Sequence, residues 1–130
     1  MIANTVSTLS DPTTPFNKMR MTVFPKWYWF NHVEPEYYPY KGTAPNKWDF
    51  KTFNPLFWQR LDKRVEELMA AGVQADIILF HPYDNGHWGF DCMGGRDPET
   101  YNTAHDNFYL RYLAARLSAF SNVWLSLIHI

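Results

Sequence analysis

Cysteine, excess charge and long apolar runs are what this sequence has least of. Its single cysteine, Cys92, excludes an internal disulfide and leaves no cysteine cluster for zinc. The 12 basic and 13 acidic side chains give a formal net charge of -1, so nothing favours binding to nucleic-acid phosphates. No apolar run approaches the roughly 20 residues that span a bilayer, and the N-terminus lacks the pattern of a signal peptide. We expect neither nucleic acid nor membrane as a partner; the sequence leaves the oligomeric state open.

Aromatic residues, by contrast, are abundant. They make up 18% of the 130 residues, with six Trp and eight Tyr, and many of them crowd into two stretches that core packing alone does not explain. Residues 25–53 contain four prolines and no helical period, which predicts a long loop. Residues 81–106 form a second predicted loop, rich in glycine.

Three apolar segments have the pattern of β-strands. They are residues 19–24, residues 75–80 and a stretch that begins near Asn122, rich in β-branched and aromatic types. The second is continuously apolar apart from Asp76, which predicts a strand buried on both faces.

Two helices are predicted between these strands. The first has Asn54 as N-cap, Pro55 at the first helical position and Gly72 at C′. Its predicted apolar stripe consists of Phe57, Leu61, Val65, Leu68 and Met69. The second is predicted to begin at Asp106 or Asn107 and to end near Ser121, with a stripe made of Tyr109, Leu113, Leu117 and Phe120.

The alternation of strands and helices predicts an α/β fold with a parallel sheet. Both long loops follow the carboxyl ends of strands, the edge at which ligands bind in (β/α)8 barrels and in open α/β sheets. Three strands cannot close a barrel. We therefore expect part of a (β/α)8 TIM barrel, with about three parallel strands and two main helices.

Polar and aromatic residues at the predicted strand ends are candidates for a sugar pocket. His81, Asp84 and Trp88 follow the second strand. They are candidates because His and Asp hydrogen-bond hydroxyls, while aromatic rings stack on the CH faces of sugars. The remaining substrate-binding candidates are Lys26, Tyr28 and Asn31, which follow the first strand. A structural role competes with this interpretation: His81 and Asp84 would then satisfy loop backbone, and Trp88 would pack against the loop.

Other functions are less favoured by the sequence. A small α/β metal-dependent hydrolase would use ligand-type residues of the second loop, namely His81, Asp84, His87, Asp91, His105 and Asp106, but no metal-binding motif is present. A non-catalytic carbohydrate-binding protein fits the aromatic loops, although such modules are mostly β-sandwiches. Glu34 and Glu36 are more typical of solvated loop charges than of a catalytic pair, and Cys92 has no evident base beside it.

Several blocks of the sequence resemble glycoside hydrolases with an apiosidase-like catalytic domain. The blocks are KMRMTVFPK, EPEYYPY, FNPLFWQRLDKRVEELMAAGVQADIILFHPYD, WGF and YLRYLAARLSAFSNVW, which together extend from about Pro15 to Trp124. The resemblance implies a (β/α)8-barrel enzyme that acts on carbohydrate with two carboxylates and needs no cofactor or metal, usually outside the cell or in the periplasm. Residues 1–124 would supply about strands two to four of its barrel.

The last residues depart from that pattern. In the family, NVW continues approximately as WSLANE, and the Glu would be the general acid/base; here Ile130 stands in its place. The final six residues, LSLIHI, are also what one reading frame of CTGTCTCTTATACACATC, a transposon end used in sequencing libraries, encodes. We therefore expect residues 125–130 to be a non-native tail. No catalytic residue is assigned, because the second carboxylate, about 5–5.5 Å from the first in retaining enzymes, would come from a later strand. The 130-residue chain alone is expected to be inactive.

Overall fold

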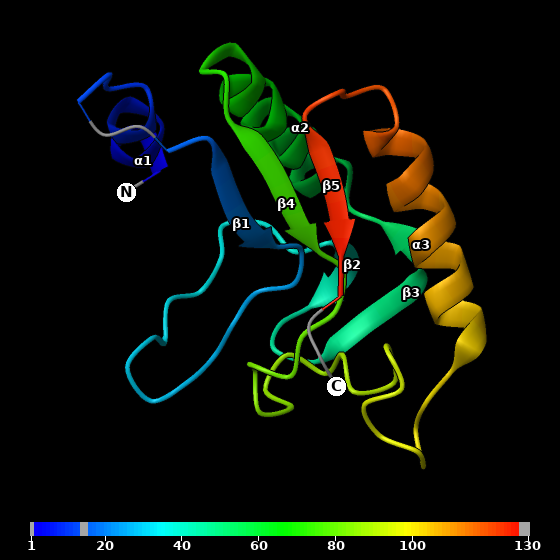
Figure 1. The fold of residues 1–130 in the computed structure, drawn as a ribbon. Helices are drawn as coiled ribbons and strands as arrows, with labels where there is room; N and C mark the ends of the chain where they lie inside the picture. Colours follow the sequence, from blue (N-terminus) through cyan, green and yellow to red (C-terminus); the bar gives the residue numbers. More distant parts are fainter. Residues whose placement is uncertain (1, 14–15, 128–130) are drawn as a thin grey trace.

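A three-stranded parallel sheet forms the centre of the computed structural model, which describes residues 2–13 and 16–127 (Figure 1). The strand order is β1-β4-β5, so that β4 lies in the middle. A separate antiparallel pair consists of β2 and β3. In chain order the elements are α1 (Ile2–Leu9), β1 (Lys18–Thr22), β2 (Tyr40–Thr43), β3 (Lys47–Phe53), α2 (Pro55–Ala70), β4 (Gln74–Ile78), α3 (Thr103–Leu117) and β5 (Val123–Ser126).

The predicted α/β class is confirmed, with three parallel strands and two main helices. Helix α2 follows β3, and helix α3 follows the second long loop. The buried side chains of both helices share one core with β4. Asn122 joins the layers, because its side-chain amide donates to the carbonyl oxygens of Val65, at 3.2 Å, and Val73, at 3.1 Å. Membership of a (β/α)8 barrel, and the division into residues 1–124 and 125–130, stay predictions. Ile128 to Ile130 lie outside the described residues.

The strands lie where they were predicted but end earlier. Residues 75–78 are buried, as the apolar run predicts, and β4 ends at Ile78. Phe24 and Phe80 lie beyond their strands, and their rings stack with centroids 6.2 Å apart. The reason is that these rings pack into an aromatic cluster: Phe24 also lies 4.6 Å from Phe90 and 5.0 Å from Tyr109, measured between centroids.

Helix α2 has the ends that its sequence predicts. The Asn54 side chain accepts a hydrogen bond from the Leu56 N–H at 3.3 Å, and Pro55 occupies the first turn. At the other end, Gly72 has φ +73° and Val73 N–H donates to the Leu68 carbonyl at 2.8 Å, the pattern of a Schellman motif. The predicted apolar stripe needs correction at three positions. Trp58 is buried together with Leu61, Val65 and Leu68, whereas Phe57 is only partly buried and Met69 is 42% exposed.

Helix α3 starts earlier than predicted. Its N-cap is Asn102, whose side chain accepts from the Ala104 N–H at 3.0 Å, and not Asp106 or Asn107. Asp106 lies in the first turn, where both its carboxylate oxygens accept from the Gly94 N–H at 2.9 and 3.0 Å. The prediction failed because Asp106 has a partner outside the helix. The helix ends at Leu117, not near Ser121.

The first long stretch is not a loop throughout, as predicted, because it contains the β2–β3 hairpin. Its aromatic side chains pack against distant rings; Trp48, for example, stacks on Phe90 with centroids 5.9 Å apart. Gly42 of strand β2 has φ +143°, and a Cβ there would lie 2.1 Å from the Lys47 carbonyl oxygen, so this position in the strand needs glycine. The hairpin depends on these long-range contacts, which local sequence patterns do not reveal.

The sheet carries charge on the face opposite the core. Asp76, only 3% exposed, alternates with Ala75 and Ile77, which point into the core. Its carboxylate accepts a hydrogen bond from the Ser126 hydroxyl at 2.6 Å and one from Arg20 Nε at 3.0 Å. The Ser126 hydrogen bond is the largest cause that lowers the pKa of Asp76, and Arg20 adds to it. A buried carboxylate thus links all three strands.

Candidate functional site: two adjoining cavities at the strand ends

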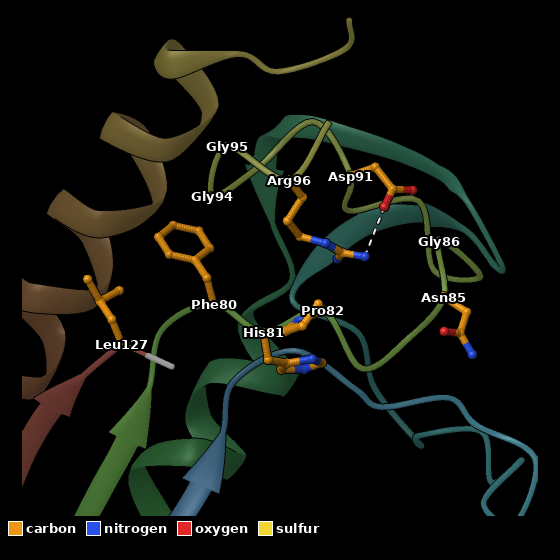
Figure 2. A pocket seen from close by; sticks show the side chains of 10 residues that line it. All are labelled: Phe80, His81, Pro82, Asn85, Gly86, Asp91, Gly94, Gly95, Arg96 and Leu127. Carbon is orange, nitrogen blue, oxygen red and sulfur yellow. Dashed lines mark ion pairs between the residues drawn. The ribbon is translucent and has the colours of Figure 1, made fainter. Parts of the chain in front are cut away.

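Two cavities open at the carboxyl ends of the strands. The first has a volume of about 390 Å³, and Figure 2 shows its lining: Phe80, Pro82 and Leu127 are apolar, whereas Asn85, Asp91 and Arg96 are polar. The second, of about 620 Å³, is lined by residues that include Thr22, Lys26, Ile78 and Tyr83. Leu127 lines both cavities, so they adjoin. Their sizes are typical of small-molecule sites.

Arg96 is the central polar residue of the first cavity. Its Nη2 donates to Oδ1 of Asp84 at 2.5 Å and forms an ion pair with Oδ1 of Asp91 at 2.9 Å. The Asp84 side chain is fully buried, that of Arg96 is 16% exposed and that of Asp91 is 36% exposed. Figure 2 shows the Arg96 side chain extending toward Asp91. The pair with Asp84 therefore fixes the guanidinium at the cavity wall.

Asp84 is a supporting residue in this arrangement. Its Oδ2 is buried and has no hydrogen-bond partner within residues 2–13 and 16–127. A buried carboxylate needs a compensating cation, which Arg96 supplies. The structure therefore places Asp84 behind Arg96, out of direct contact with a ligand.

Gly94 allows the loop that carries Arg96 to lie against Phe80. A Cβ at Gly94 would lie 3.0 Å from ring atoms of Phe80, and the residue has φ +69°. The Gly94 N–H is held by Asp106 from helix α3. Phe80 and the loop that carries Arg96 thus line the same cavity.

His81 borders the first cavity with both ring nitrogens engaged. Its Nδ1 accepts from the Tyr83 N–H at 3.0 Å, so Nδ1 carries no proton, and Nε2 then donates to the Phe24 carbonyl at 2.8 Å. Burial lowers the pKa of His81, because the charged form loses solvation, and the backbone carbonyl of Phe24 opposes this in part. The imidazole is therefore neutral near pH 7 and orients the loop.

Trp88 belongs to the core. Its side chain is fully buried, its Nε1 lies 3.4 Å from the Lys26 carbonyl, and its ring packs edge-on against Trp27 at 5.3 Å. It presents no ring face to a cavity. Trp27 itself lies between His32, at 4.5 Å, and His87, at 3.8 Å, between ring centroids.

Lys26 lines the second cavity. Its Nζ lies 5.5 Å from the ring centroid of Tyr83, a cation–π contact, and Tyr83 accepts a backbone hydrogen bond from the Trp27 N–H at 2.7 Å. These contacts join the first long loop to the second at the edge of the cavity. Lys26 can donate hydrogen bonds to a ligand there.

Tyr28 and Asn31 form a turn away from both cavities. Their backbones exchange two hydrogen bonds, at 3.3 and 2.7 Å, and the Asn31 side chain accepts from the Val33 N–H at 3.4 Å. Between them Trp29 is 84% exposed and Phe30 is 68% exposed. Of the six predicted substrate-binding residues, the structure therefore brings His81 and Lys26 to cavity walls, with Asp84 behind Arg96.

Several of the residues considered for a metal site have other partners. Asp91 pairs with Arg96, His87 stacks on Trp27, and the ring of His105 stacks on Phe50 at 4.5 Å. Within residues 2–13 and 16–127, no three His, Cys, Asp or Glu side chains come together as a metal site.

Three other features considered from the sequence lie outside the cavities. Glu36 pairs with Arg60 of α2, at a hollow that Glu34 also lines. Burial raises the pKa of the Cys92 thiol, which disfavours the reactive thiolate. Within the described parts of the chain, no helix is both long and apolar enough to cross a membrane.

Sequence reasoning missed Arg96 and Phe80 as cavity residues. Phe80 was assigned to the second strand, and Arg96 lies in the run Gly94-Gly95-Arg96, which gives no sign of its distant partners. An arginine between two glycines and an aspartate is a weak signal by itself.

Comparisons with known proteins give one informative result. No protein-family model matches the chain, and no curated protein does. A solved structure does match. It is described as that of a putative glycoside hydrolase from Bacteroides vulgatus, with 41% sequence identity and a TM-score of 0.82. The match covers 95% of this chain but 24% of the other, so the chain spans about a quarter of the length of the protein that it resembles.

Proposed function

We propose that this chain supplies part of the carbohydrate-binding cleft of a glycoside hydrolase. The observation that carries the proposal is the pair of adjoining cavities at the strand ends, within a fold that matches a putative glycoside hydrolase at 41% identity. The carboxyl ends of parallel strands are where α/β enzymes bind their substrates.

The first cavity has the groups that sugar recognition requires. Phe80 supplies an aromatic surface for the CH face of a ring, whereas Asn85, Asp91 and Arg96 supply donors and acceptors for hydroxyls. In the second cavity Lys26 and Tyr83 play the corresponding polar and aromatic parts.

The parent reaction is hydrolysis of an O-glycosidic bond by two carboxylates, with retention of configuration. Retaining enzymes place a general acid/base and a nucleophile about 5–5.5 Å apart. Among the described residues that line the two cavities, Asp91 is the only carboxylate, and it is paired with Arg96. On this proposal the catalytic pair belongs to sequence outside these 130 residues, and the chain serves in binding. The apiosidase-like (β/α)8 barrel is the architecture that we propose for the parent protein.

The proposal is tested by measuring binding and turnover separately. Two-dimensional NMR of the 130-residue chain with neutral methyl glycosides is expected to shift amide signals of residues 80–96. Aryl glycosides are expected to remain uncleaved. Turnover that survives repeated purification would contradict the assignment of catalysis to sequence outside the chain, and a lack of binding by every glycoside would contradict the cleft.

A matched pair of variants locates the binding. Lys26→Met removes the ammonium from the second cavity, whereas Lys51→Met removes the same group from an exposed position on β3. Binding of a disaccharide long enough for both cavities is expected to weaken in Lys26→Met alone. Equal weakening in both variants would indicate a general charge effect.

A further inference from the structure

We propose that the first cavity selects an uncharged sugar unit and disfavours uronic acids, with Arg96 and Asp91 as the residues that determine this specificity. The inference rests on the proposed carbohydrate-binding function and deepens it, because it names the class of sugar unit that the cavity takes.

The charges beside the cavity do not favour an anion. Two carboxylates, of Asp84 and Asp91, surround the one guanidinium of Arg96, so that the cluster has a formal charge of -1. A uronate would bring another carboxylate to a site where the cation is already compensated. Like charges at short range in a partly buried site oppose binding, and an uncharged hydroxyl avoids this cost.

The geometry of Arg96 leads to the same conclusion. A guanidinium binds a carboxylate strongly when two neighbouring nitrogens donate to its two oxygens. Both such edges of the guanidinium include Nη2, and Nη2 already contacts Asp84 at 2.5 Å and Asp91 at 2.9 Å. Arg96 can therefore offer Nε or Nη1 as single donors, which suit hydroxyl oxygens, but not a free two-nitrogen edge.

The other groups near the first cavity do not make it favour an anion. Both ring nitrogens of His81 are engaged, by the Tyr83 N–H and the Phe24 carbonyl, and its burial favours the neutral form. Lys26 lies in the neighbouring cavity, where its ammonium faces Tyr83. Asn85, which also lines the first cavity, adds an uncharged amide.

Matched glycoside pairs test the selectivity. The probes are methyl β-glucopyranoside with methyl β-glucuronopyranoside, and the corresponding galacto pair, each differing at C6 alone. They are titrated into the 130-residue chain at low ionic strength, and affinity is followed through the amide signals of Gly86, Gly94 and Gly95. For whichever pair binds, the uronate is expected to bind about tenfold more weakly, the order of one unscreened like-charge contact.

Two variants separate the charge of the cavity from that of the whole protein. Asp91→Asn brings the formal charge of the cluster to zero at constant size. The difference in affinity between neutral sugar and uronate is then expected to narrow several-fold. Glu99→Gln makes the same change at an exposed position of the same loop, outside the cavity, and is expected to leave that difference unchanged.

The outcomes distinguish this inference from the proposed function. Equal or tighter binding of the uronate would overturn the selectivity and leave carbohydrate binding intact. If Asp91→Asn left the difference in affinity unchanged, or if Glu99→Gln narrowed it equally, the role of Asp91 would be overturned. Failure of every neutral and acidic probe to bind would overturn the proposed function itself.

Discussion

Arg96 and Asp84 form a pair in which one member faces a cavity and the other is wholly enclosed. The Nη2–Oδ1 distance is 2.5 Å, and the side chains are 16% and 0% exposed. The pair connects the stability of the protein to the geometry of its candidate site, because the enclosed carboxylate needs the cation that the cavity uses.

Removal of Arg96 should therefore cost much stability. Arg96→Met leaves the Asp84 carboxylate buried without a cation, and we expect the free energy of unfolding to fall by about 3–5 kcal/mol. The double variant Asp84→Asn/Arg96→Met should recover a large part of that loss. Urea unfolding measures both, and additive effects of the two substitutions would show that the residues are not coupled.

Trp88 should behave as a core residue. Trp88→Ala is expected to lower the free energy of unfolding by about 3–5 kcal/mol, because the ring is fully buried. Trp29→Ala removes the same side chain from a position that is 84% exposed, and its effect should stay within about 0.5 kcal/mol. Comparable losses of stability in thermal or urea unfolding would contradict the placement of these two rings.

The two N-caps should each contribute measurably to the free energy of unfolding. Asn102→Ala removes the acceptor of the Ala104 N–H, and Asn54→Ala removes that of the Leu56 N–H, each at a cost of about 1 kcal/mol. Asn107→Ala, within helix α3 and exposed, is the control and should be neutral or slightly stabilising. If the Asn107 substitution cost more than the Asn102 substitution, the helix would begin where the sequence alone predicted.

Stability should depend on pH through His81. Burial lowers its pKa in the folded protein below the ordinary value of 6.5, so the unfolded chain binds the proton more readily. The contribution of neutral His81 to the free energy of unfolding is complete above about pH 6.5 and is lost progressively as the pH falls below that value. His81→Asn keeps an acceptor for the Tyr83 N–H but cannot titrate, so its unfolding free energy should fall less between about pH 7.5 and pH 5.

A separate acidic range belongs to Asp76. Its pKa is lowered from 3.8, so its contribution persists above that value and is lost only as the pH falls through the lower folded-state value. A wild-type profile that is flat from pH 7.5 to pH 5 would contradict the prediction for His81 without bearing on Asp76.

Features encoded locally could be predicted from the sequence. Asn54, Pro55 and Gly72 define helix α2 through contacts with residues at most five positions away, so their pattern is sufficient. Features that depend on distant partners could not. The N-cap of α3 was misplaced because Asp106 bonds to Gly94, and the β2–β3 hairpin is held by rings such as Phe90, more than thirty residues along the chain.

The candidate site likewise has features that local sequence predicts and features that depend on distant partners. The strand-end rule predicted a site at the edge of the sheet where the two cavities lie, and His81 and Lys26 line those cavities. It could not show that Trp88 turns inward, because an aromatic residue in a glycine-rich loop has the same sequence pattern whether its ring faces solvent or core. Nor could it show that Arg96 returns to Asp84.

The carboxylate of Asp76 has a consequence for how the sheet assembles. Side chains alternate along a strand, so a slip of one residue in β4 would turn Asp76 toward the apolar core and separate it from Arg20 and Ser126. Such a slip would bury an uncompensated charge while two polar groups lost their acceptor. Two effects thus favour the correct strand register. Apolar packing favours it on the face covered by the helices, and the electrostatic cost of a misaligned Asp76 favours it on the opposite face.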